Sequence, residues 1–164
     1  MGEGGRVGGF DGDTTADGFP RKDGDSLFGK MMLAIRGSHS FGNKVRMLKF
    51  PLILTDTKLY GGALANFYWL TRALELRLES PEVQAHPILT HVRDLGLKVT
   101  KGYEADLKQL LGDDWQTAAA SARTPATDSY VAAIQNADAV QLIAAAFILY
   151  GALVIGGGKQ TQVF

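Results

Sequence analysis

The sequence predicts an all-α fold. Apolar residues recur at helical spacings of three and four through most of the chain after residue 26. Proline and glycine fall mainly between these segments, where they are expected to end helices. Strand signals are nearly absent, because no hairpin dipeptide joins two alternating segments. With 164 residues, the chain is long enough for one domain with a substantial core.

The composition excludes several classes of protein. Seventeen basic residues balance seventeen acidic ones, so there is no electrostatic case for binding nucleic acid. The absence of cysteine excludes disulfides, thiolate catalysis and cysteine-ligated metal. The first 26 residues contain eight glycines and no apolar core, so they resemble no signal peptide. We expect residues 1–25 to form a flexible Gly/Asp-rich tail and residues 26–164 to form the helical domain, in the cytoplasm or an organelle.

The first helix is expected to begin at Ser26. Its apolar stripe follows spacings of four, three and four residues: Phe28, Met32, Ile35 and His39. We expect these side chains to be buried on one face. A break is expected at Phe50-Pro51, because proline lacks the backbone N–H that a helix needs.

Prolines and helix-capping residues define the ends of the elements that follow. The second helix is expected to begin near Asp56 or Thr57 and to end at Ser80-Pro81. His86-Pro87 marks either a turn or a new helix start. Two further helical segments are predicted, over Gly102–Gly112 and Pro125–Gln135.

Residues 142–158 form an apolar run that ends in three glycines. We interpret it as a helix buried in a helical core. The alternative is a small integral membrane protein, because the seventeen residues of this run lie at the lower limit of the roughly 17–25 that span a bilayer. Glycines at its end would let a large flat ligand approach the backbone closely.

Several short segments follow one another in a characteristic order and spacing. They are Phe67–Glu75 (FYWLTRALE), His86–Leu89 (HPIL), Tyr103–Leu107 (YEADL), Leu110–Trp115 (LLGDDW), and Thr124–Ala126 with Tyr130-Val131. The ordered set resembles the haem oxygenase family over about residues 26–160. This resemblance implies a layered helical fold that holds haem between a proximal helix and a glycine-kinked distal helix. It also implies cleavage of haem with O₂ to biliverdin, iron and CO, with electrons from a donor protein.

The resemblance also implies which residues hold haem and its iron. His39 matches the histidine ligand, and neutral imidazole suits haem iron. Arg36 lies one helical turn before it and either meets a haem propionate or belongs to a solvated helix face. On the distal side, the resemblance implies that haem is bound by Phe147, Gly156 and Gly157. The other two histidines are less suitable ligands, because they lie near turn residues: His86 and His91.

The distal helix departs from the family pattern. Leu153 occupies the position of an aspartate that orders water beside the iron, and no catalytic residue is assigned. Other polar or glycine positions are also replaced, at Ala145, Phe147, Leu149, Ala152 and Ile155. Since general acid delivery commonly contributes a factor of about 10²–10⁴ in rate, activity is expected to be weakened or lost.

The chain also ends before the last helices of the family domain, so we expect a C-terminally truncated fold. Such a fold would leave apolar surface that needs a partner. Two functions therefore stay open, with enzyme status undecided. One is a haem oxygenase with weakened activity. The alternative is a non-catalytic haem binder or a structural subunit of a larger assembly, such as an organellar one.

Overall fold

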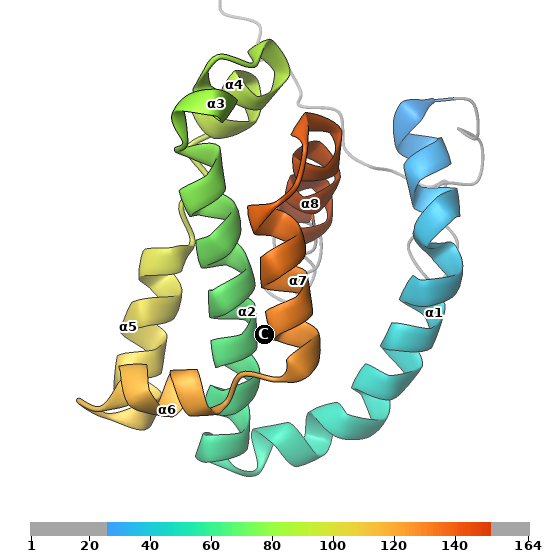
Figure 1. Cartoon of the computed structure of the whole chain (residues 1–164). Helices are drawn as coiled ribbons and strands as arrows, with labels where there is room; N and C mark the ends of the chain where they lie inside the picture. Colours follow the sequence, from blue (N-terminus) through green and yellow to red (C-terminus); the bar gives the residue numbers. More distant parts are fainter. Residues whose placement is uncertain (1–25, 152–164) are drawn as a thin grey trace, which may run out of the picture. The chain divides into compact units, whose positions relative to one another are not determined.

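The computed structural model describes residues 26–151, which form eight α-helices and no strand, as the sequence predicts (Figure 1). The chain divides into two compact units, Met1–Leu52 and Ile53–Phe164. The helices are α1 (Leu27–Leu54), α2 (Thr57–Leu78), α3 (Pro81–Gln84), α4 (Pro87–Asp94), α5 (Thr100–Leu111), α6 (Trp115–Ser121), α7 (Pro125–Gln135) and α8 (Ala139–Gly151).

Helix α1 begins where the sequence predicts, directly after Ser26, whose Oγ accepts a hydrogen bond from the Gly29 amide at 3.0 Å. The expected break at Phe50-Pro51 is wrong, because α1 continues through Pro51 to Leu54. A proline removes one hydrogen bond, but its fixed φ is compatible with helix, and only three helical residues follow it. Met32 and Ile35 are half-buried, so the burial expected of their stripe is only partial.

Helix α2 is the centre of the second unit. It contacts α5, α6, α7, α8 and α3, and Figure 1 shows it between α5 and α7. Its start is confirmed, since the Asp56 carboxylate caps it by accepting hydrogen bonds from the Lys58 and Leu59 amides at 2.7 and 3.1 Å. Its end before Ser80-Pro81 is also confirmed.

The second unit contains two apolar clusters. The larger joins α2, α3, α4, α7 and α8 around Leu74, Leu89 and Leu142, which are almost completely buried. The smaller joins α2, α5 and α6 around Ala65, Tyr68, Leu107, Trp115 and Ala119. Every buried residue of these clusters lies after residue 56, so the second unit has a core of its own.

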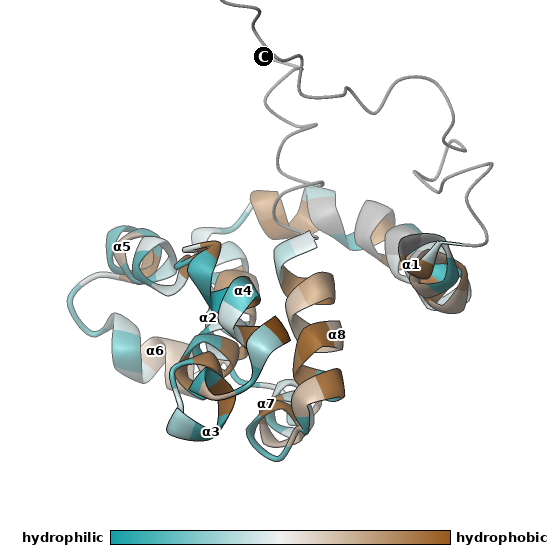
Figure 2. Ribbon diagram, turned by 90° about the horizontal axis from the view of Figure 1, so that it is seen from above, coloured by the Kyte–Doolittle hydropathy of each residue, from teal (hydrophilic) through white to brown (hydrophobic). Residues whose placement is uncertain are grey.

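Helix α8 is strongly hydrophobic in Figure 2, whereas α5 is largely hydrophilic. Ala145, Ala146, Leu149 and Tyr150 of α8 lie in the larger cluster, which confirms a buried helix for the described part of the apolar run. Across residues 26–151, no helix has both the length and the apolar character needed to cross a bilayer. The rest of the run, residues 152–158, lies outside the described residues.

The N-terminus of α5 is capped from another helix. Its own N-cap residue, Val99, has no side-chain oxygen to offer. Glu75 of α2 supplies one instead, because its Oε1 accepts hydrogen bonds from the Val99 amide at 2.7 Å and the Thr100 amide at 3.1 Å. One carboxylate thus satisfies two backbone donors that a helix start leaves open.

Candidate functional site

The expected iron ligand lies on α1. His39 belongs to this helix, and positions 32, 35 and 39 share one of its faces. The side chain of His39 lies outside what the structure describes. Arg36, one turn earlier, is exposed. The helix therefore carries one imidazole position on a stripe with half-buried Met32 and Ile35.

The distal positions fall partly on α8. Phe147 is half-buried, while Ala145 and Leu149 are buried in the core. Apolar side chains at these two buried positions are accounted for by packing, because a buried polar group without a partner would cost stability. The remaining distal residues lie outside the described part of the chain: Ala152, Leu153, Ile155, Gly156 and Gly157.

The two other histidines lie on or next to α4. His86 is its N-cap residue, which resolves the open alternative at His86-Pro87 in favour of a helix start. The imidazole is half-buried, and its Nδ1 atom is buried with no hydrogen-bond partner among the residues that the structure describes. His91 is exposed. Within residues 26–151, no group of three or more His, Asp or Glu side chains is placed to hold a metal ion.

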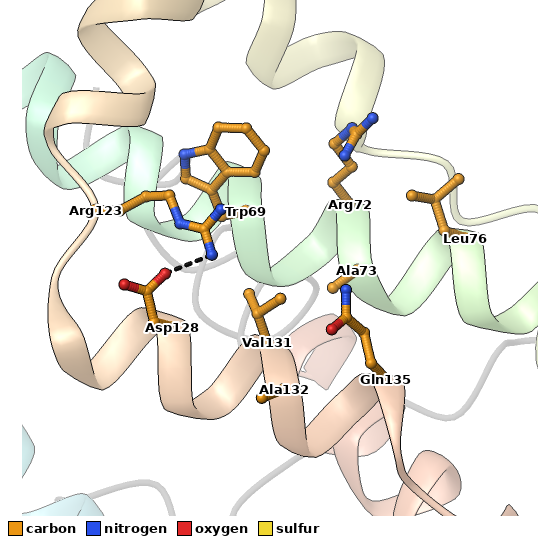
Figure 3. Close-up of a pocket in the computed structure, with 9 residues that line it drawn as sticks. All are labelled: Trp69, Arg72, Ala73, Leu76, Arg123, Asp128, Val131, Ala132 and Gln135. Atoms are coloured by element: carbon orange, nitrogen blue, oxygen red, sulfur yellow. Dashed lines mark ion pairs between the residues drawn. The ribbon is translucent and has the colours of Figure 1, made fainter.

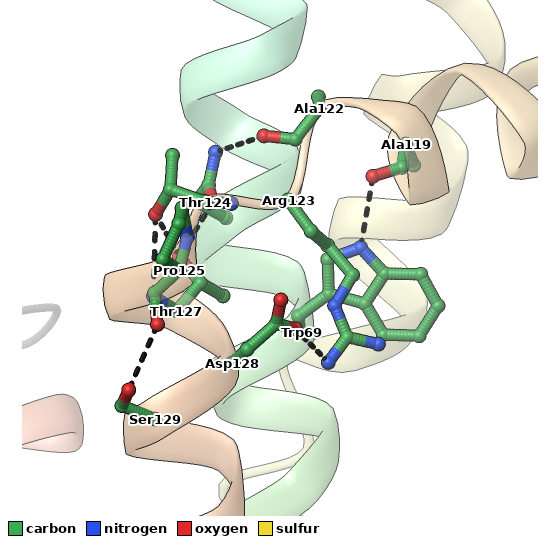
Figure 4. A network of polar contacts seen from close by, with 10 residues as sticks. Trp69, Ala119, Ala122, Arg123, Thr124, Pro125, Thr127, Asp128 and Ser129 are labelled. Carbon is green, nitrogen blue, oxygen red and sulfur yellow. Dashed lines mark hydrogen bonds and ion pairs between the residues drawn. The ribbon is translucent and has the colours of Figure 1, made fainter.

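A set of polar residues that sequence reasoning missed lies where α2 meets the start of α7 (Figure 4). The Asn66 side-chain amide donates hydrogen bonds to the carbonyls of Gly62 at 2.7 Å and Ala122 at 3.0 Å. Its oxygen accepts from the Thr124 amide at 3.2 Å and the Thr127 hydroxyl at 2.5 Å. Asn66 thus joins three segments, and no local pattern signals this role because three of its four partners lie more than fifty residues away.

A pocket of about 310 Å³ lies beside this network, between α2 and α7. Figure 3 shows Trp69 and Arg72 from α2 together with Arg123 and Asp128. Arg123 and Asp128 form an ion pair. Sequence reasoning did not find this pocket, because no spacing rule relates Arg72 to an arginine in the connection between α6 and α7.

Burial dominates the electrostatics of the tyrosines. It raises the pKa of Tyr150 to about 12, and the nearby Glu75 carboxylate adds to the effect. Burial also raises the pKa of Tyr68, which Arg72 lowers and Glu104 raises further. Because a phenol with a pKa near 12 holds its proton at neutral pH, Tyr150 is a weak proton donor.

The family comparison covers most of the second unit and part of the first. A family model described as heme oxygenase matches residues 29–162. No curated protein and no solved structure matches the chain. The match includes α1 with His39, the α2 segment FYWLTRALE and all of α8. Since it extends over well more than half of the sequence, the chain belongs to the haem oxygenase family.

Proposed function

We propose that this protein binds haem through His39 and that it activates oxygen on haem only weakly. The observation that supports weak activation is the chemistry of α8. Among its described residues, only Gln141 and Tyr150 carry side chains able to make strong hydrogen bonds. Gln141 bonds to the backbone of Asp138 at the start of the helix, and Tyr150 is buried. No described side chain of α8 is therefore suited to ordering water or delivering a proton.

The residues present fit haem as a ligand. A porphyrin supplies four of the iron ligands itself, so a single imidazole is enough, and a three-residue metal site is not required. The His39 position shares its helix face with Met32 and Ile35, which suit the apolar porphyrin surface. When bound, haem would supply the iron for oxygen chemistry. Arg36, which is exposed on the same helix, is suited to pairing with a propionate carboxylate.

A haem titration followed by absorbance tests the binding step. We expect one haem per chain, with a Soret band that His39→Ala abolishes or shifts strongly. The matched control is His91→Ala, which changes an exposed histidine of α4 and should leave the spectrum unchanged. An unaltered spectrum for His39→Ala would remove His39 as the ligand.

A turnover assay with excess reductant tests the second step. The natural sequence should release little biliverdin, whereas Leu153→Asp, which restores a carboxylate at the family position, should increase the yield. Rapid stoichiometric biliverdin formation by the unmodified protein would contradict weak activation, and would show that another group delivers the proton.

A structural subunit is the second candidate function. It is favoured by large exposed apolar side chains on α1, such as Leu27, Phe41 and Leu48, which are at least 70% exposed. This candidate predicts that the folded protein does not bind haem at all. The same titration therefore distinguishes the two proposals.

A further inference from the structure

The pocket between α2 and α7 belongs entirely to the second unit. It contains no residue of α1 or α8, so it is separate from the residues proposed to hold haem. Its lining combines a tryptophan, two arginines, one carboxylate, one amide and four aliphatic side chains: Trp69, Arg72, Ala73, Leu76, Arg123, Asp128, Val131, Ala132 and Gln135.

The indole of Trp69 is held in place from several sides. Its Nε1 donates a hydrogen bond to the Ala119 carbonyl at 3.0 Å, and its ring meets the Tyr68 ring edge-on at 5.0 Å. The Arg123 guanidinium lies 4.8 Å from the indole centroid and is ion-paired with Asp128. Cation–π contact and the ion pair fix Arg123 against the ring. This side of the pocket is therefore ordered before any ligand arrives.

Within residues 26–151, Arg72 differs from Arg123 in having no anionic partner. Its guanidinium lies 5.7 Å from the same indole centroid, and its side chain is exposed. Among the described residues, it makes no hydrogen bond or ion pair. Since Asp128 offsets the charge of Arg123, the lining has an excess of one positive charge, located on Arg72. A guanidinium is a planar fork of donors that matches a carboxylate in geometry and charge.

The rest of the lining is apolar. Ala73 and Leu76 of α2 and Val131 and Ala132 of α7 contribute aliphatic surface to the lining (Figure 3). A volume of about 310 Å³ lies at the small end of ligand sites, which suits a single ring. We propose that this pocket binds a small aromatic monocarboxylate, with its carboxylate on Arg72 and its ring against Trp69 and the aliphatic side chains.

Calorimetric titration of the full chain without haem tests the proposal, with benzoate as the probe. We expect saturable binding of one benzoate per chain. Benzamide keeps the ring but lacks the charge, and inorganic phosphate keeps a negative charge but lacks the ring. Each should bind at least about tenfold more weakly than benzoate, because each loses one of the two kinds of contact.

Arg72→Gln should weaken benzoate binding at least about tenfold. The variant should fold normally, because the Arg72 side chain is exposed. The matched control is Arg93→Gln on α4, where the arginine pairs with Asp94 outside the pocket and the substitution should leave affinity unchanged. Circular dichroism confirms that each variant is folded. The proposal is overturned by the absence of saturable binding, by equal affinity for benzamide or phosphate, or by an unchanged affinity in Arg72→Gln.

Discussion

At the residue scale, Asn66 has more influence on stability than its half-buried position suggests. Its amide makes four hydrogen bonds, and three of them join α2 to both sides of the α6–α7 connection. We expect Asn66→Ala to lower the free energy of unfolding by about 1–3 kcal/mol, because it leaves several partners unsatisfied. Asn136→Ala is the control, since among the described residues that side-chain amide bonds to the nearby Ala132 carbonyl alone. Urea denaturation measures both, and equal losses would contradict the role assigned to Asn66.

A second residue-scale prediction concerns alkaline pH. The Tyr150 phenol has a folded-state pKa of about 12, raised from its ordinary value of 10.0. Between these values the unfolded chain has released a proton that the folded chain keeps, so stability falls as pH rises from 10 toward 12. The Tyr150 phenol accounts for a total loss of roughly 2–3 kcal/mol in the free energy of unfolding. Urea denaturation across this pH range should show a smaller decline in the free energy of unfolding for Tyr150→Phe than for the unmodified protein. The decline that remains comes from three other tyrosines whose pKa values are also raised, Tyr68, Tyr103 and Tyr130. Identical pH profiles would contradict the assignment to Tyr150.

At the scale of elements, the cap that Glu75 provides for α5 leads to a further prediction. Glu75→Ala removes the acceptor of two backbone amides and should lower the free energy of unfolding by about 1–2 kcal/mol. Glu79→Ala, at the C-cap of the same helix, removes an exposed ion pair with Lys98 and should have a much smaller effect. Thermal denaturation of the two variants provides the comparison. If the Glu79 variant were the less stable one, the capping role would be rejected.

The elements also show how far the sequence reaches. The bounds of α7 match those expected from Thr124-Pro125, because a capping threonine and a proline define a helix start locally. In contrast, α6 was not predicted. Its seven residues are too few to show periodicity, and Trp115 is buried through contacts with other helices. Helix α5 likewise starts earlier than its apolar pattern indicates, because its cap comes from Glu75 of α2.

The sequence likewise predicts some features of the candidate site and not others. The prediction that His39 is the iron ligand comes from the resemblance to haem oxygenases, and the apolar character of α8 can be read directly from the sequence. The residues that Ala145 and Leu149 pack against and the pocket around Trp69 cannot be read from it. Both depend on which helices pack together, and residues 50 apart carry no mutual signal in one sequence.

At the scale of the whole molecule, the second unit has its own hydrophobic core. No described residue of the first unit is among the buried residues of that core. We therefore expect a fragment of residues 53–164 to fold by itself, with a cooperative thermal transition and helical circular dichroism. The fragment lacks His39 and should not ligate haem, but it keeps the residues that line the pocket between α2 and α7. A broad, non-cooperative transition would show that the second unit needs α1 to fold.

The bond from Glu75 to the start of α5 has a further consequence, for hydrogen exchange. Amides in the first turn of a helix usually exchange quickly with solvent, because they have no partner within the helix. The Val99 and Thr100 amides instead donate to a carboxylate on α2, so their exchange requires α2 and α5 to separate. The exchange rate of these two amides would therefore report how often the two helices separate. Amides in the middle of either helix do not report this motion by itself, because they bond within their own helix.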